Sequence, residues 1–236
     1  FPLNVDVPME RYPWMNWLIM AAMFVAFGWQ HTHPDEAAQF ILGIEEFEIG
    51  IEQHPLAILG HMFLHADILH LLGNLMFLWV FGNAVCAKVG QIAHLLLFLG
   101  TGVLTGIIEP YGLGASGAIN GIVGAYLVMY PLNDITCFYI FIIRVDTFSL
   151  ASYWMILLWF AFDLFGLIVG DESVAYLSHV SGVLTGSLAM TVLLITGFIE
   201  ANEHEQSLLD LWRERRGSGE GGARAQADGR SAPHLS

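Results

Sequence analysis

Long apolar runs, each close to the thickness of a lipid bilayer, restrict the fold of this chain more than any other feature. Six of them, roughly 16 to 26 residues long, follow one another along the 236 residues. They are Trp14–Trp29, Ile68–Cys86, Ile92–Ile108, Ala115–Tyr130, Ser152–Val169 and Val174–Ile199. A helix needs about 20 such residues to cross the hydrocarbon core. The runs therefore predict an all-α membrane protein, a polytopic bundle of six transmembrane helices.

Composition supports this class. Apolar residues make up 56% of the chain and charged residues 13%, and the mean hydropathy is +0.60. A membrane β-barrel would instead show alternating segments of about ten residues. The first run has one basic residue before it and no small-residue cleavage site after it, so we expect a retained helix rather than a signal peptide.

The positive charges predict the orientation of the bundle. All eight basic residues fall on one side of the six runs. They are Arg11, Lys88, Arg144, Arg213, Arg215, Arg216, Arg224 and Arg230. Because basic loops stay inside, we expect both termini to be cytoplasmic. Cys86 and Cys137 fall on or near that side, where a disulfide is not expected. The net charge of −14 does not favour nucleic acid as a partner.

The segments between and after the runs are of three kinds. The outer loop Gln30–Asp67 is half apolar and is expected to lie in the membrane interface. The inner segment Ile135–Ile143 is aromatic and β-branched, which predicts an interfacial strand or a short helix. We expect one membrane domain, residues 1–200, and a cytoplasmic, largely disordered tail, 201–236, with a short amphipathic helix around Leu208–Trp212.

Four polar residues are predicted to share one depth in the outer half of the bundle. His70 and Asn74 lie one helical turn apart near the outer end of the second run. Ser116 begins the fourth run, and His179 lies five residues into the sixth. A serine becomes a nucleophile when a base such as neutral histidine takes its proton. Asn74, His70 and the Ser116 amide could supply the donors that a developing oxyanion needs.

Each residue also has a simpler interpretation. A serine after Gly-Ala at the start of a membrane helix often packs or caps. A histidine within a membrane can line a transport path. Gly117, Gly121 and Gly124 on the fourth run, with Gly182 and Gly186 on the sixth, allow close helix contact and could serve packing alone. The same glycines would also bring Ser116 next to His179.

Three segments, HADILHLLGNLMFLWVFGN, GASGAINGIVGAYLVMYP and LSHVSGVLTG, resemble the signature regions of the rhomboid intramembrane serine proteases. The resemblance implies Ser116 as nucleophile, His179 as general base, and an oxyanion hole made by His70, Asn74 and the Ser116 amide. A core of six helices without a seventh is similar to the simplest prokaryotic members. It also implies a prokaryotic inner membrane, no cofactor and no metal.

The chain departs from the family pattern in places. Gln53-His54-Pro55 stands where a Trp-Arg pair is usual, and Asn120 stands where some members have an aromatic residue. Asn120 could bond near His179 or face a neighbouring helix. Asp163 is an ionisable group in lipid and hence a functional candidate, but the family works with a dyad, so we do not expect it to orient His179.

Three further histidines have weaker claims to a role. His61 and His65 could form a metal site with His70, but no carboxylate at ligand spacing supports one. They are expected in the loop that enters the second run. His94, in the third run, is expected to be a packing residue.

These observations predict an intramembrane serine endopeptidase that cleaves the transmembrane segments of other proteins near the outer face of the bilayer. An inactive rhomboid-like protein that binds transmembrane helices is the main alternative. A small transporter would be expected to carry internal repeats, and none is visible. The expected partners are transmembrane substrates and the lipid bilayer, and the sequence does not indicate an oligomeric state.

Overall fold

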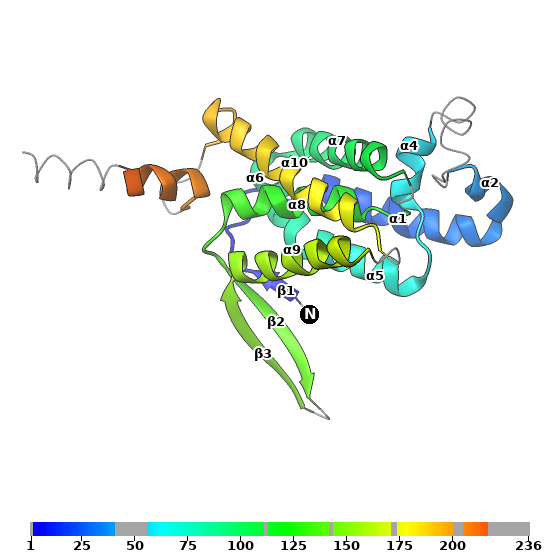
Figure 1. Cartoon of the computed structure of the whole chain (residues 1–236), viewed down its shortest axis with the longest axis horizontal. Coiled ribbons are helices and arrows are strands. Elements are labelled where there is room, and N and C mark those ends of the chain that lie inside the picture. The colour runs from blue at the N-terminus through cyan, green and yellow to red at the C-terminus, as the bar shows by residue number, and fades with distance from the viewer. Residues whose placement is uncertain are drawn as a thin grey trace, which may run out of the picture.

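The structure, a computed structural model, describes residues 2–40, 56–110, 113–141, 144–170, 174–200 and 205–216. Helices dominate it, and they gather around a central helix while a small sheet extends to one side (Figure 1). The helices are α1 (Trp14–Thr32), α2 (Pro34–Ala38), α4 (Ala57–Gly60), the 3₁₀ turn η1 (His61–Phe63), α5 (Ile68–Phe77), the π-helical turn η2 (Leu78–Gly82), α6 (Asn83–Val89), α7 (Gln91–Ile108), α8 (Ser116–Met129), α9 (Ser152–Val169) and α10 (Tyr176–Ile195).

Four helical segments are long and apolar enough to cross a membrane. They are Ile68–Val89, which joins α5, η2 and α6, together with α7, α9 and α10. The chain is therefore an integral, multi-pass membrane protein. The first and fourth predicted runs also form helices, α1 and α8, but α8 is shorter, with 14 residues, and α1 is not among the four. The predicted count of six spans is thus only partly supported.

The central helix is α8. Eleven of its 14 residues are buried, so it is surrounded by protein rather than by lipid. Its closest neighbour is α10, because glycines on both helices remove the side chains that would separate them. A Cβ added at Gly186 would overlap the carbonyl of Gly121, and one at Gly182 would overlap the carbonyl of Gly117. The predicted glycine contact between the fourth and sixth runs is confirmed.

The sheet has three antiparallel strands in the order β1 (Pro2–Val5), β2 (Asp134–Phe141) and β3 (Arg144–Ala151). The strands β2 and β3 form a hairpin that extends away from the helices (Figure 1). Of the two alternatives for Ile135–Ile143, the strand is confirmed for the residues within β2. The sequence did not predict β1 and β3, because neither has the apolar content of a buried strand.

The outer loop, the tail and the two cysteines were each the subject of an expectation. The predicted interfacial loop Gln30–Asp67 is helical at both flanks, in α1, α2, α4 and η1, while residues 41–55, with Gln53-His54-Pro55, lie outside the described residues. The predicted amphipathic helix is present at 208–216. Cys86 and Cys137 are buried and free, as expected.

A buried cation joins three parts of the chain on the predicted cytoplasmic side. Lys88 Nζ lies 2.7 Å from Glu10 Oε1 and 2.6 Å from Glu205 Oε2. Tyr130 donates its hydroxyl hydrogen to Glu205 Oε1 at 3.3 Å. Since a buried charge is costly unless it is paired, these contacts anchor the segment after α10 to the bundle.

A second polar cluster lies inside the helical bundle, around the fully buried Asn16 of α1. Asn16 Nδ2 donates to the carbonyl of Leu78, at the start of the π-helical turn, and to Asn83 Oδ1, both at 2.8 Å. Asn16 Oδ1 lies 3.1 Å from His94 Nε2 on α7. The expected packing role of His94 is therefore confirmed, with a hydrogen bond to α1.

We predict that Asn16→Leu lowers the free energy of unfolding by about 1–3 kcal/mol, because it leaves the partners of the amide unpaired in an apolar interior. Unfolding by SDS titration in detergent micelles would measure the change. Ala21→Leu, at an exposed position of the same helix, is the matched control and should change stability little. Equal stability of the two variants would contradict the role of the cluster.

Candidate active site

A cavity of about 320 Å³ lies between α5, α8, α9 and α10. It is lined by Leu69, His70, Gly73, Asn74, Phe77, Ser116, Ile119, Asn120, Val123, Ile156, Trp159, Phe160, Phe162, Asp163, His179 and Val183. All four residues selected from the sequence, His70, Asn74, Ser116 and His179, are in this set. Three separate helices thus bring them to one pocket.

The backbone just before α8 brings Ser116 close to the side chains of α5. Ser116 is the first residue of α8, and Gly114 two positions earlier has a φ of +108°. That angle is strained for residues with a side chain. A Cβ at Gly114 would also lie 2.8 Å from His70 Cε1 and 3.5 Å from Asn74 Nδ2. Only glycine lets the loop pass this close to His70.

The start of α5 fixes where His70 and Asn74 point. Asp67 caps the helix by accepting a hydrogen bond from the His70 amide at 2.9 Å, and this backbone bond lowers the pKa of the Asp67 carboxyl. Asn74 follows one turn later and is buried. Within the described part of the chain, its Nδ2 is a buried donor without a hydrogen-bond partner. An unpaired buried donor is costly, so its place beside a cavity suits a ligand oxygen.

The imidazole of His179 is held by a carboxylate. His179 Nδ1 lies 3.0 Å from Asp163 Oδ1 on α9, and the two side chains are only 16% and 18% exposed. This contact was not expected, because the family works with a dyad. It arises from the packing of α9 against α10.

Asn120 lies within the cavity rather than against a neighbouring helix alone. Its Nδ2 donates to the carbonyl of Ser116 at 2.9 Å, which closes the first turn of α8. It contributes a polar wall near His179, but its described hydrogen bond goes to the backbone. The two alternatives were a hydrogen bond near His179 and a position against a neighbouring helix. The described contacts favour the second, because a Cβ at Gly182 of α10 would lie 3.1 Å from the Asn120 Cβ.

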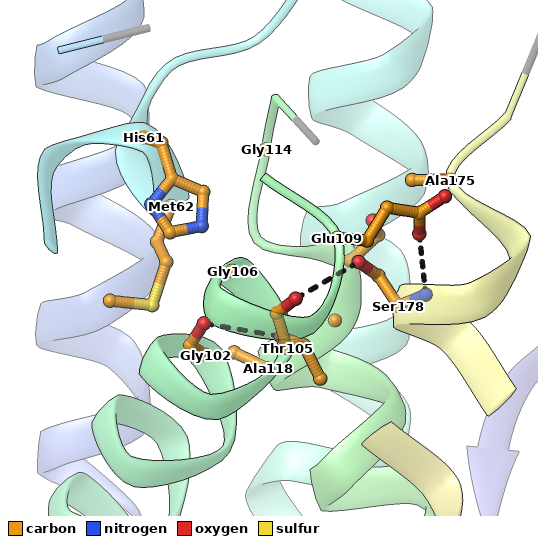
Figure 2. Close-up of a pocket in the computed structure, with 12 residues that line it drawn as sticks. His61, Met62, Gly102, Thr105, Gly106, Glu109, Gly114, Ala118, Ala175 and Ser178 are labelled. Atoms are coloured by element: carbon orange, nitrogen blue, oxygen red, sulfur yellow. Dashed lines mark hydrogen bonds between the residues drawn. The ribbon is translucent and has the colours of Figure 1, made fainter. Parts of the chain in front are cut away.

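On the other side of Ser116 lies a smaller polar cavity of about 10 Å³ (Figure 2), roughly the space that one water needs. Glu109 reaches across it from the end of α7 and accepts a hydrogen bond from the Ser178 amide at 2.6 Å. Ser178 Oγ also lies 3.4 Å from the Thr105 carbonyl. Figure 2 shows these contacts fixing the beginning of α10, next to His179, to α7.

Glu109 was not singled out from the sequence. Glu109 and Ser178 are 69 positions apart, so their contact depends on the tertiary fold. The available signal was general: a carboxylate is favourable near the N-terminus of a helix.

The histidines before α5 support the loop rather than gather as ligands. The carbonyl of His61 accepts a hydrogen bond from the Gly114 amide at 3.0 Å. His65 is fully buried, and its backbone is bound on both sides by Gln30, at 3.0 and 2.7 Å. The rings of His65 and His70 meet edge to face at 5.2 Å. Among the described residues, no group of three or more His, Cys, Asp or Glu side chains could hold a metal ion.

Burial of His65 predicts a pH dependence of stability. Burial, with a smaller contribution from His70, lowers the pKa of the His65 imidazole from 6.5 to about 4. As the pH falls from 6.5 towards 4, the unfolded chain binds a proton that the folded chain does not. The free energy of unfolding should therefore decrease by up to about 1.4 kcal/mol per pH unit on this account. Denaturation of wild type and His65→Gln at several pH values would test this.

The dependence on pH should be shallower in His65→Gln than in wild type. Phe63→Leu, in the same loop but without a titratable group, is the matched control and should keep the wild-type slope. Identical slopes in all three proteins would show that His65 does not contribute.

Comparison with known proteins agrees with this geometry. The family described as "Rhomboid domain" matches residues 52–196, more than half of the chain. Rhomboid protease GlpG of Haemophilus influenzae is 28% identical over 151 residues, 64% of this chain and 72% of that protein. GlpG of Klebsiella pneumoniae is 26% identical over 180 residues, 74% of this chain and 61% of that protein. The mitochondrial presenilin-associated rhomboid-like protein of Mus musculus is 26% identical over 167 residues, 66% of this chain but only 42% of that protein. The chain belongs to the rhomboid family.

Proposed function

We propose that this protein is an intramembrane serine endopeptidase that cleaves transmembrane segments near the outer face of the bilayer. The observation that carries the proposal is the single cavity that Ser116, His179, His70 and Asn74 line together. Each of these residues alone has a structural explanation. A hydroxyl, an imidazole and an unpaired amide donor around one pocket are the parts that acyl transfer requires.

In the proposed mechanism, His179 removes the proton of the Ser116 hydroxyl as Ser116 Oγ attacks the carbonyl carbon of the substrate peptide. The tetrahedral intermediate collapses, the C–N bond breaks, and His179 gives the proton to the leaving amine. Water then attacks the acyl-enzyme, with His179 again as the base. The second product leaves with a carboxylate, and the Ser116 hydroxyl is restored.

The negative charge of the intermediate needs donors in fixed positions. Asn74 Nδ2 is buried at the cavity without another described partner, so it is available to an oxyanion. Gly114, two residues before Ser116, lies close to the side chains of both His70 and Asn74. Preorganised donors of this kind stabilise the transition state more than the substrate.

The surroundings of the cavity suit a substrate within the membrane. Apart from Asp163, its wall on α9 is apolar, with Ile156, Trp159, Phe160 and Phe162, and α9 has only three buried residues in its 18. A helical substrate hides its backbone, so we expect cleavage at segments weakened by glycine or proline, with a small residue before the scissile bond. Access for a substrate past α9 fits this arrangement. The family resemblance also implies residues 171–173 as a gate, but they lie outside the described residues.

The proposal includes the membrane topology. We place α1 and α8 as the two remaining spans, giving six, with both termini on the cytoplasmic side of a prokaryotic inner membrane. The basic residues at the ends of the spans support this orientation. Residues 1–200 would form the membrane domain and 201–236 the tail. Residues 217–236 lie outside the described part of the chain.

Ser116→Ala and His179→Ala should each abolish cleavage of a single-span reporter substrate by the purified protein, because each removes one half of the proposed dyad. Thermal unfolding in detergent should remain cooperative. A fluorophosphonate probe should label wild type but not Ser116→Ala. Measurable turnover by either variant would exclude the dyad. Absence of turnover and labelling in wild type would favour an inactive rhomboid-like protein that binds transmembrane helices.

Asn74→Ala should lower kcat by about 10²- to 10³-fold, or about 2.7–4 kcal/mol of transition-state stabilisation, if the amide binds the oxyanion. Steady-state kinetics with the reporter substrate would measure the loss. Asn16→Leu provides the control, because it removes another buried amide, one that does not line the cavity, and should reduce stability without reducing kcat. An unchanged rate in Asn74→Ala would remove Asn74 from this role.

A further inference from the structure

The cavity holds one carboxylate, and it contacts the proposed general base. Among the described residues that line the cavity, Asp163 is the one acidic side chain. Its Oδ1 lies 3.0 Å from His179 Nδ1, and both side chains are mostly buried. Placing an ionisable group in a membrane helix is expensive. A specific partner within the bundle is the arrangement that offsets this cost.

The packing of α9 on α10 places this pair. On α9, Gly166 follows Asp163 by one turn, and on α10, Tyr176 precedes His179 by one turn. The Tyr176 ring packs directly over Gly166, where a Cβ would overlap it. The same ring lies 6.5 Å from the His179 ring, edge to face. Two contacts at matching spacing, Tyr176 on Gly166 and His179 on Asp163, therefore fix the register of the two helices.

No other described side chain orients the imidazole by a hydrogen bond. Asn120 on α8 also lines the cavity, but its amide is bonded to the Ser116 carbonyl. Tyr176 contacts His179 edge to face through its ring. In the described part of the chain, the hydrogen bond of the His179 ring goes to Asp163 alone.

We propose that Asp163 is a positioning residue that makes a triad of Ser116, His179 and Asp163. This proposal rests on the proposed proteolytic function. Asp163 accepts a hydrogen bond from the Nδ1–H of His179, so that the lone pair of the neutral ring is on Nε2. The proton of Ser116 Oγ then moves to Nε2 and later to the leaving amine, while Asp163 stays ionised throughout. Its charge stabilises the imidazolium that forms in between.

The charged and titratable neighbours of His179 come from four helices. Asp163 faces it from α9 and His70 from α5, where the two imidazoles interact electrostatically. Tyr176 lies on α10 itself, and Glu109 at the end of α7 binds the adjacent Ser178 amide. Asp163 is the one that contacts the ring with a carboxylate. Its removal should therefore change the pH at which the base becomes active.

The test compares Asp163→Asn, Asp163→Glu and wild type in cleavage of the single-span reporter across pH. Asp163→Asn should lower kcat by about 10- to 10³-fold with KM changed less than about twofold, because the wrong tautomer is favoured and the imidazolium is not stabilised. The acidic limb of its pH–rate profile should move to lower pH. Asp163→Glu should restore part of the rate and the wild-type limb. Leu164→Ala changes the adjacent residue, which is exposed on α9, and should leave kcat and the acidic limb unchanged.

An unchanged kcat and an unchanged acidic limb in Asp163→Asn would overturn the positioning role. Turnover by Ser116→Ala would instead overturn the proposed function, so the two failures are distinguishable. If Asp163→Asn does not fold, ¹⁵N NMR of wild type labelled at histidine decides the matter. Hydrogen on Nδ1 of the neutral His179 ring is the predicted result, and hydrogen on Nε2 would contradict it.

Discussion

The close contact of α8 with α10 is the interaction on which the rest of the structure depends. Lipid offers no hydrophobic driving force between membrane helices, so they must gain stability from close packing and from polar contacts. The Gly121 backbone meets Gly186 with no side chain between them. Because Ser116 starts one of these helices and His179 lies near the start of the other, their packing brings a hydroxyl and an imidazole to one pocket. Glu109, at the end of α7, accepts a hydrogen bond from the Ser178 amide, and this bond holds the start of α10 to α7.

Several features of this arrangement could be predicted from the sequence, since they depend on composition and local spacing. Apolar length gave the helices at Ile68–Val89, α7, α9 and α10, and glycine spacing predicted which faces meet. His70 and Asn74 fall on one face of a helix because they are one turn apart. Ser116 and His179 were grouped because each lies only a few residues from the predicted outer end of its apolar run.

Other features depend on tertiary contacts that no local pattern encodes. Asp163 and His179 are 16 residues apart on two different helices, α9 and α10, and their contact depends on how the Tyr176 ring packs over Gly166. The sheet was recognised only at its central strand, because β1 and β3 pair with it through backbone hydrogen bonds that most sequences can make. The buried ion pair of Lys88 and Glu205 joins residues 117 positions apart. The sequence alone therefore did not predict that the two side chains meet.

The central claim is that Ser116, His179 and Asn74 act together on one carbonyl group. A crystal structure of the protein after reaction with a fluorophosphonate tests it most directly, because the bound phosphonyl oxygen takes the place of the oxyanion. The account predicts a covalent bond to Ser116 Oγ, a phosphonyl oxygen within hydrogen-bond distance of Asn74 Nδ2, and His179 still in contact with Asp163. An adduct on another residue, or a phosphonyl oxygen directed away from Asn74, would contradict it.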